Sequence, residues 1–304
     1  MNGALILDKP AGPTSHDVVA RVRRATGIKR VGHTGTLDPA ATGVLVLLLG
    51  RATRLARFLA LSDKAYDARI RLGRATTTYD ATGNEVPRAE VGLAGGVDPA
   101  AIAPEAIETA LAGFRGTIRQ APPPYSAKKV GGVRAYALAR RRQPVAPPAA
   151  SVTAHALEVT GIDGTALSLG IVCSSGFYVR SLAHDLGIRL GCSAHLESLR
   201  RTRTGPFGVE HAVALERLEA EGLDAVARLI PMADLLPDLP AHVLTDRGAR
   251  RAAHGNAVAA ADVVETLPGP GTEGLVRLLD RHGALLAVAE PRTGQILHPV
   301  VVLV

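Results

Sequence analysis

The segment from Gly32 to Gly50, GHTGTLDPAATGVLVLLLG, joins a polar, glycine-rich stretch containing one histidine and one aspartate to an apolar run. Asp38 stands among glycine, threonine and proline residues, which predicts a shaped loop. A carboxylate in such a loop can serve as a nucleophile, a general base, a metal ligand or a turn cap. Taken alone, an aspartate before proline is most often a turn cap, and a single histidine such as His33 is most often a structural hydrogen-bonding residue.

Metal and phosphate chemistry fit this segment poorly. His33 and Asp38 have no further histidine, cysteine or acidic neighbour in the segment, so they make a poor metal site. The segment also lacks the Gly-Lys-Ser/Thr ending of a phosphate-binding loop. We therefore expect no metal and no cofactor.

Two further side chains could work with Asp38. The stretch YDARIRLG, from Tyr66 to Gly73, alternates between apolar and polar residues, which predicts a strand with Tyr66 on its inward face. Arg180 follows SSGFYV, where a strand is expected to turn into a helix. An arginine beside an aspartate favours and orients the carboxylate, and a tyrosine ring can stack on a base while its hydroxyl passes a proton.

The surrounding pattern predicts a mixed α/β body. Ala4–Leu7 and Val44–Leu49 are typical of buried strands, and TSHD at Thr14–Asp17 predicts a capped helix that ends at Gly27. Asp163-Gly164 indicates a hairpin turn. Further helices are expected through Leu55, Phe58 and Leu59, and through Leu182, Leu186 and Leu190.

The second half of the chain contains an insertion, a linker and a small β-rich tail. Residues 122–148 are rich in Pro, Gly and Arg and predict a surface loop with a short helix inside it. Residues 231–240 are interpreted as a linker. Beyond them, Thr245 is expected to cap a basic helix, followed by three strands. We expect two domains, residues 1–236 and 237–304.

Composition indicates a folded protein with a polyanionic partner. The 304 residues are 47% hydrophobic, and 35 Lys and Arg against 28 Asp and Glu leave a net charge of +7. Basic clusters occur at Arg21–Arg24, Ala139–Arg142, Arg200–Arg203 and Arg247–Arg251, which favours phosphate binding, with an ordinary solvated basic surface as the alternative. The chain has two unpaired cysteines and no signal-peptide pattern, which predicts a cytoplasmic protein. It has no long apolar run, so we expect that it does not span a membrane.

Five blocks, in this order, carry a family resemblance: DKPAGPTSHDVV, GHTGTLDPAATGVL, DKAYDARIRLG, GFYVRSLAHDLG and HLESLRRTRTGPF. With the tail they resemble, over essentially the whole chain, the bacterial tRNA pseudouridine-55 synthases of the TruB type. The resemblance implies an α+β pseudouridine-synthase fold, with a central mixed, mainly antiparallel β-sheet flanked by helices and loops. It also implies a small C-terminal β-barrel module of the PUA type that binds RNA.

The resemblance assigns roles to individual residues. Asp38 is implied as the essential carboxylate, Tyr66 as the tyrosine that stacks on the target uracil, and Arg180 as the partner of Asp38. Lys9 with Pro10 is implied to support the catalytic loop. The residues implied to bind the flipped nucleotides are His33, Tyr178, Leu199 and Asp80.

The same resemblance implies the partner and the activity. The enzyme would isomerise uridine in the T loop of tRNA after flipping the base out. It would grip the T-arm stem-loop with cations of the insertion, namely Lys128, Lys129, Arg134, Arg140, Arg141 and Arg142. A monomer without guide RNA is expected. Whether the carboxylate adds at C1′ or removes the C2′ proton stays open, because both routes use the same residue.

Three departures and two rival readings accompany this assignment. Ala40 stands where leucine is usual, Thr77 where aspartate is usual, and Phe177 where threonine is common, so packing beneath the loop and one polar contact are in question.

One rival is an RNA-binding chaperone that assists tRNA folding, a role that can coexist with the enzyme. The other is a nucleoside hydrolase, which would release free uracil.

Overall fold

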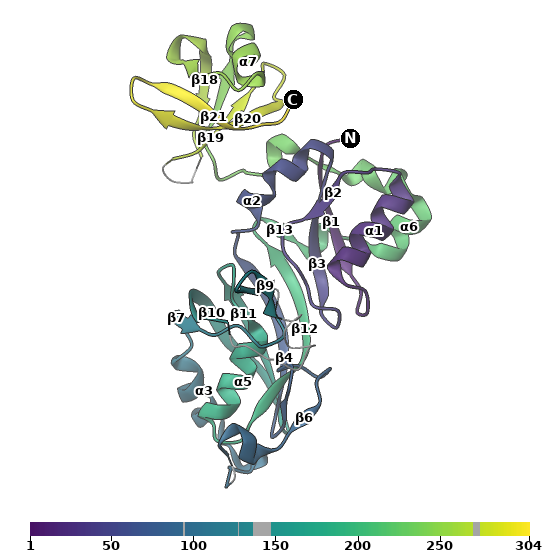
Figure 1. Cartoon of the computed structure of the whole chain (residues 1–304), viewed down its shortest axis with the longest axis vertical. Helices are drawn as coiled ribbons and strands as arrows, with labels where there is room; N and C mark the ends of the chain where they lie inside the picture. Colours follow the sequence, from purple (N-terminus) through teal and green to yellow (C-terminus); the bar gives the residue numbers. More distant parts are fainter. Residues whose placement is uncertain (94, 127, 136–146, 270–273) are drawn as a thin grey trace.

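The body of the molecule is built on one mixed sheet, and a smaller sheet forms its C-terminal end (Figure 1). In this computed structural model, residues 1–93, 95–126, 128–135, 147–269 and 274–304 are described. The body sheet has eleven strands in the order β14-β1-β3-β12-β4-β11-β10-β7, with β2, β13 and β15 attached to β3, β12 and β1. Its neighbours are antiparallel except β1–β14 and β3–β12. The predicted fold class is confirmed.

The elements have the following bounds. The body strands are β1 Gly3–Lys9, β2 Val31–His33, β3 Thr42–Leu49, β4 Lys64–Leu72, β7 Gly116–Gln120, β10 Ala150–Asp163, β11 Ala166–Cys173, β12 Ala194–Thr204, β13 Phe207–Gly208, β14 Val213–Ala214 and β15 Ile230–Pro231. The helices are α1 Ser15–Thr26, α2 Ala56–Leu59, α3 Pro104–Ala112, α5 Val179–Arg189, α6 Leu215–Glu221 and α7 Asp246–Ala253. The 3₁₀ turns are η1 Gly50–Leu55, η2 Arg88–Val91, η3 Pro99–Ala101, η4 Val209–His211, η5 Asp224–Arg228, η6 Met232–Asp234 and η7 Ala260–Asp262. Two small hairpins, β5 Ala75–Thr76 with β6 Glu85–Val86 and β8 Lys129–Val130 with β9 Val133–Arg134, complete the body.

A narrow seam joins the two halves of the body sheet. On one side β3 pairs with β1 and β2 and is covered by α1 and α6, while on the other side β12 pairs with β4 over nine residue pairs. Across the seam, β12 meets β3 at only two pairs, Arg200 with Thr42 and Arg201 with Gly43. The loop that carries Asp38 enters β3 at this point, so the halves meet where the candidate carboxylate lies.

Local sequence signals account for most of these elements. Thr14 caps α1 through a reciprocal pair of hydrogen bonds with Asp17, and Gly27 ends the helix in the left-handed conformation. Gly164 has φ 57° at the tip of the β10–β11 hairpin, as the Asp-Gly pair predicts. In β4 the alternation holds, and Tyr66 faces the core with 9% of its surface exposed.

Two expectations need revision, and a third falls partly outside the described residues. The helix through Leu55 and Phe58 is mostly a 3₁₀ turn followed by four residues of α-helix. No strand leads directly into α5, because β11 ends at Cys173 and residues 174–178 form a turn. Within the insertion, the described residues form the β8–β9 hairpin, while the expected short helix lies outside the described residues.

The C-terminal module is a curled sheet of six strands in the order β17-β21-β20-β19-β16-β18. Its strands are β16 Ala241–Leu244, β17 Val258–Ala259, β18 Val263–Leu267, β19 Val276–Leu279, β20 Leu285–Arg292 and β21 Ile296–Val302. Thr245 caps α7 as expected. The PUA-like β module is therefore present, and within the described residues its edge strands β17 and β18 do not pair with each other.

The segment interpreted as a linker is part of a shared core. Leu235 and Leu236 are buried in one apolar cluster that contains both β3 of the body and Val288 of the module. Arg54 donates to the carbonyl of Val302 at 2.6 Å. The module is thus docked on the body, and the division at residues 236 and 237 stays a prediction. Among the described residues, no helix is long and apolar enough to cross a membrane.

We predict that Gly43→Ala destabilises the protein by about 2 to 4 kcal/mol. Gly43 has φ 99°, and a Cβ there would collide with the backbone carbonyl of Arg201 at the seam. Gly12→Ala is the matched control, because Gly12 has φ 108° with no atom within 4 Å of the added Cβ, so only backbone strain of about 1 kcal/mol applies. Urea unfolding of both variants checks this, and equal losses would contradict a steric role for the seam.

Candidate active site

Asp38 and Arg180 form the central ion pair of the site. Nε of Arg180 lies 2.9 Å from one carboxylate oxygen of Asp38, and its Nη2 donates to the other oxygen at 3.2 Å. Arg180 lies in the first turn of α5 and is nearly buried, with 8% of its side chain exposed against 40% for Asp38. This two-point contact fixes the plane of the carboxylate and leaves part of it accessible.

Asp80 shares the same guanidinium. Its Oδ2 lies 3.4 Å from Nη1 of Arg180, and its Oδ1 accepts hydrogen bonds from the hydroxyls of Thr78 and Thr82. Burial is the largest influence on Asp38 and raises its pKa, Arg180 and Lys9 lower that pKa, and the negative charge of Asp80 raises it. The carboxylate form of Asp38 therefore depends on Arg180.

Lys9 holds the two ends of the loop together. Its side chain is fully buried and donates to the carbonyls of Pro10 at 2.8 Å, Pro39 at 3.1 Å and Ala41 at 2.8 Å. Burial lowers the pKa of Lys9 to about 8, although the charge of Asp38 opposes the shift. The structural contact expected of Lys9 with the loop is thus present, and it is made to backbone carbonyls.

Arg201 is a buried cation that the sequence reading missed. Only 2% of its surface is exposed, and it donates to the carbonyl of Val44 at 2.7 Å through Nε and to that of Gly35 at 3.1 Å through Nη2. Its Nη1 donates to the carbonyl of Thr36 at 3.4 Å, and it is the register partner of Tyr66 on β4. One guanidinium therefore connects the loop of Asp38 to β3 beside the strand of Tyr66.

The signal for Arg201 was present in the alternation of β12. Leu199 pairs with Ala68 and Arg201 with Tyr66, so both side chains face the same way as the buried face of β4. The RRTR cluster was interpreted as a surface for phosphates. That interpretation is wrong for Arg201, because the strand period places it inside.

The other candidate binding residues surround this centre on several elements. Tyr178 precedes the first residue of α5, and its backbone exchanges two hydrogen bonds with the side-chain amide of Gln120. Leu199 packs against the apolar cluster that contains Tyr66. His33 ends β2 beside His16, with ring centroids 5.2 Å apart, and burial lowers its pKa.

Only part of the predicted RNA-gripping set lies in the described residues. Lys128 is exposed beside the β8–β9 hairpin, to which Lys129 and Arg134 belong. Arg140 and Arg141, with Arg142, lie outside the described residues. In the part of the chain that is described, no three His, Cys, Asp or Glu side chains come together as metal ligands.

The structure shows the exposure and contacts of the three residues that depart from the family pattern. Ala40 is exposed and lines a cavity of about 250 Å³ together with Leu199, while the loop is underpinned by buried Leu37 and Ala41. Thr77 is exposed, and its backbone N–H bonds to Asn84. Phe177 is buried in the same apolar cluster as Tyr66. The residue at position 40 therefore does not lie beneath the loop.

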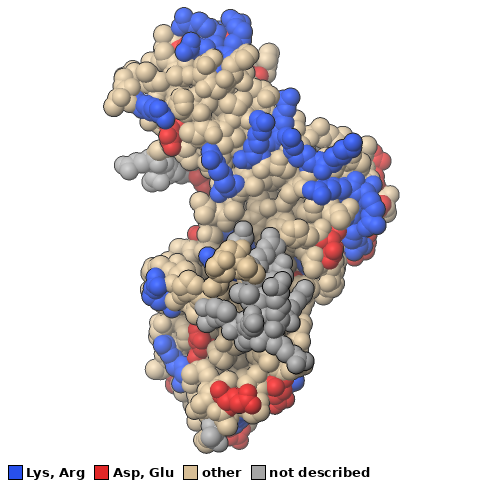
Figure 2. All heavy atoms as spheres, viewed as in Figure 1, with Lys and Arg blue, Asp and Glu red and all other residues tan. Residues whose placement is uncertain are grey.

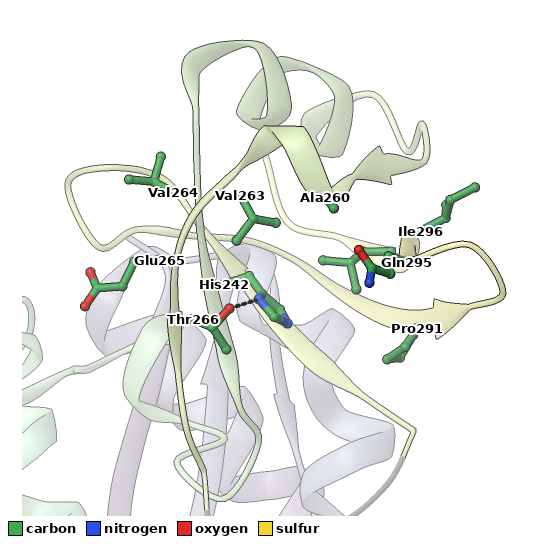
Figure 3. A pocket seen from close by; sticks show the side chains of 10 residues that line it. His242, Ala260, Val263, Val264, Glu265, Thr266, Pro291, Gln295 and Ile296 are labelled. Atoms are coloured by element: carbon green, nitrogen blue, oxygen red, sulfur yellow. Dashed lines mark hydrogen bonds between the residues drawn. The ribbon is translucent and has the colours of Figure 1, made fainter.

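A larger cavity, of about 450 Å³, lies in the C-terminal module between β18 and the β20–β21 hairpin (Figure 3). Its lining is mostly apolar, and His242 bonds to the hydroxyl of Thr266 at 2.9 Å. Glu265 points away from His242 in Figure 3. Its lining offers no carboxylate paired with a cation, so Asp38 stays the candidate carboxylate.

Two family models match this sequence. The model described as TruB family pseudouridylate synthase (N terminal domain) matches residues 23–179. The model described as tRNA pseudouridylate synthase B C-terminal domain matches residues 180–235.

Relatives match over nearly the full length. The chain is 45% identical over 310 residues to tRNA pseudouridine synthase B of Thermobifida fusca, covering 99% of this chain and 98% of that protein. It is 42% identical over 297 residues to the protein of the same name from Geobacter sulfurreducens, covering 97% and 95%.

Chains in solved H/ACA ribonucleoprotein structures have a similar fold. The archaeal box H/ACA sRNP Nop10-Cbf5 complex contains a chain with a TM-score of 0.73 and 27% identity, covering 99% of this chain and 86% of that one. An H/ACA RNP bound to a substrate RNA containing 2'-deoxyuridine gives a TM-score of 0.75 and 25% identity, covering 99% and 85%.

We predict that Arg201→Lys lowers the free energy of unfolding by about 2 to 4 kcal/mol, because one ammonium cannot reach the carbonyls of Gly35, Thr36 and Val44 together. Arg200→Lys is the neighbouring control. Its guanidinium is 39% exposed and paired with Asp8, so the expected loss is below about 1 kcal/mol. Guanidinium chloride unfolding measures both, and similar losses would contradict the role given to Arg201.

The lowered pKa of Lys9 predicts a rise of stability with pH. Below about 8 the ammonium is charged in both states and its burial is costly, whereas between 8 and 10.5 the folded state releases the proton more readily than the unfolded state. The free energy of unfolding of the wild type relative to Lys9→Met should therefore increase over that window. Unfolding at several pH values checks it, and a constant difference would show that the three carbonyls fully offset the cost of burial.

Proposed function

This chain belongs to the TruB family of pseudouridylate synthases, and we propose that it isomerises uridine 55 in the T loop of tRNA with Asp38 as the reacting carboxylate. The observation that carries this proposal is the two-point ion pair between Asp38 and Arg180 beside the strand of Tyr66. It combines a partly accessible carboxylate with a fixed cation and a buried aromatic residue.

The reaction needs a carboxylate at the ribose and no outside reagent. The bond between N1 of uracil and C1′ breaks and the ring turns. C5 then joins C1′ and loses its proton to a base, while N1 gains a proton, so atoms and electrons balance within one nucleotide. Asp38 either adds to C1′ or takes the C2′ proton, and both routes require its ionised form. Arg180 favours that form because it donates to both carboxylate oxygens.

Tyr66 is proposed to hold the uracil while it is detached. Burial is the largest influence on its hydroxyl and raises its pKa, so the phenol stays neutral. Arg201 lies opposite Tyr66 in the register of β12 and β4, and Leu199 and Tyr178 are proposed to line the remaining pocket. A closed, apolar surround keeps the free base from escaping before C5 reacts.

The remaining residues are proposed to hold the flipped nucleotides and the RNA backbone. Asp80 keeps Arg180 in place and faces the same site. His33 is proposed to stack in the opened T loop. The cations of the insertion, Lys128, Lys129, Arg134, Arg140 and Arg141, are proposed to contact phosphates, which offsets the unstacking cost of a few kcal/mol.

We propose tRNA itself as the substrate, without a guide RNA. The relatives at 41 to 45% identity are named for tRNA, whereas the chains from H/ACA particles share 25 to 27%. The proposal includes action as a monomer in the cytoplasm, recognition of the T-arm stem-loop, and RNA binding by the C-terminal module from residue 237 onward.

Asp38→Asn tests the proposal. We expect pseudouridine formation on an unmodified tRNA transcript to fall by at least about 10³-fold, with tRNA binding retained, because the amide can neither add nor accept a proton. Asp67→Asn, an exposed aspartate on the outer face of β4, is the control and should keep full activity. Mapping at single-nucleotide resolution measures the product.

Other outcomes of that experiment are equally informative. Free uracil in place of an isomerised nucleotide would identify a hydrolase and overturn the proposal. Activity retained in Asp38→Asn would remove this carboxylate from the mechanism. Assistance to tRNA folding that persists in the inactive variant would show a separate chaperone role beside the enzyme.

A further inference from the structure

Exposed cations gather on one part of the body. Figure 2 shows Lys and Arg along the surface that runs from the C-terminal module over α2 and α1, whereas the far end of the body carries mixed charges. We call this the basic surface. Its members come from α1, the turn before β2, and the η1–α2 segment: Arg23, Arg24, Lys29, Arg30, Arg51, Arg54 and Arg57.

Within the described part of the chain, these cations have no acidic partners, in contrast to several paired arginines elsewhere on the body. Among the described residues, none of the ion pairs involves a member of the basic surface, whereas Arg21, Arg74, Arg115 and Arg217 are each paired with a glutamate. Arg54 and Arg57 donate to carbonyls of β21. Exposed like charges repel one another, so an unpaired group of this size fits an anionic ligand.

The basic surface lies at the far end of β3 from Asp38. Arg30 and Arg51 flank the point where the N–H of Gly50 bonds to the carbonyl of Arg30 at 2.8 Å, while the catalytic loop precedes Thr42 at the other end. Eight residues of strand separate the ends by roughly 26 Å, at about 3.3 Å per residue. A ligand that reaches both must be long and carry repeated negative charge.

We propose that the basic surface binds the phosphate backbone of helical RNA at a distance from the reacting uridine, so that one tRNA occupies both places. This inference rests on the proposed function and extends it to a second contact region. The phosphate backbone is the chemistry that unpaired guanidinium and ammonium groups recognise without reading bases.

Helical RNA fits better than a single strand. Proteins that bind single strands combine cations with exposed aromatic rings for stacking. The aromatic residue on the η1–α2 segment is Phe58, and the guanidinium of Arg57 already covers its ring at 4.7 Å. The basic surface can therefore contact RNA phosphates but has no free aromatic ring in the η1–α2 segment on which a base could stack.

A triple substitution tests the inference with two RNAs, an unmodified full-length tRNA and a short T-arm stem-loop. The first triple variant combines Arg24→Gln, Arg30→Gln and Arg51→Gln. We expect it to raise KM for tRNA by about tenfold or more and to leave kcat unchanged. The slope of log kcat/KM against log salt should flatten by about 2 to 3. KM for the stem-loop should stay as in the wild type, because that RNA ends before the basic surface.

The control triple is Arg74→Gln, Arg115→Gln and Arg217→Gln, which changes the net charge equally but removes paired arginines. We expect it to leave KM for tRNA within about twofold of the wild type, and thermal melting verifies the fold of both triples. An equal rise of KM in the two triples would overturn the inference, because net charge alone would then explain it. So would an equal rise for both RNAs.

Two more outcomes separate this inference from its rivals. The wild type could bind anionic phospholipid vesicles while the first triple loses that binding and keeps the wild-type KM for tRNA. This outcome would assign the surface to membranes and overturn the proposal. Failure of the wild type to modify either RNA would reject the proposed function itself. Wild-type behaviour of the first triple on both RNAs would reject only the second contact region.

Discussion

The buried guanidinium of Arg201 is the interaction on which the arrangement of the site depends. A buried cation is costly unless its donors are satisfied, and here the carbonyls of Val44, Thr36 and Gly35 accept them. These acceptors belong to β3 and to the loop of Asp38, and Arg201 itself is the register partner of Tyr66 on β4. Because the two halves of the sheet share only two residue pairs at the seam, this one side chain sets how loop and tyrosine face each other.

The cations around Asp38 have separate tasks because they have different acceptors. Lys9 is satisfied by three backbone carbonyls and fixes the shape of the loop. Among the described residues, Arg180 is the cation that contacts the carboxylate of Asp38, and it also pairs with Asp80. Asp38 is thus surrounded by positive charge without being neutralised on every side. A carboxylate in this state keeps one accessible edge, which a nucleophile or a base at a ribose requires.

Patterns of local origin could be read from the sequence, while long-range ones could not. The capping of α1, the β10–β11 hairpin and the inward face of Tyr66 each follow from a few adjacent residues. The pairing of Asp38 with Arg180 came only from the family resemblance, since 142 residues separate them. Arg201 was missed because its basic neighbours suggested a solvated cluster, and the register of β12 against β4, which composition does not reveal, turns it inward.

Strand β3, which follows the loop of Asp38, also sets the distance between Asp38 and the basic surface. Gly43–Leu49 of β3 is buried throughout, and the strand is hydrogen-bonded on one side to β1 and on the other to β2 and β12. Such a strand cannot stretch or bend without breaking ladder bonds in a closely packed core. Its two ends therefore stay at a fixed separation. If Asp38 reacts and the basic surface binds RNA as proposed, this fixed separation selects RNA helices long enough for one molecule to contact both. Recognition by shape then needs no contact with base edges, and the loop remains free to accept the single nucleotide that leaves the stack.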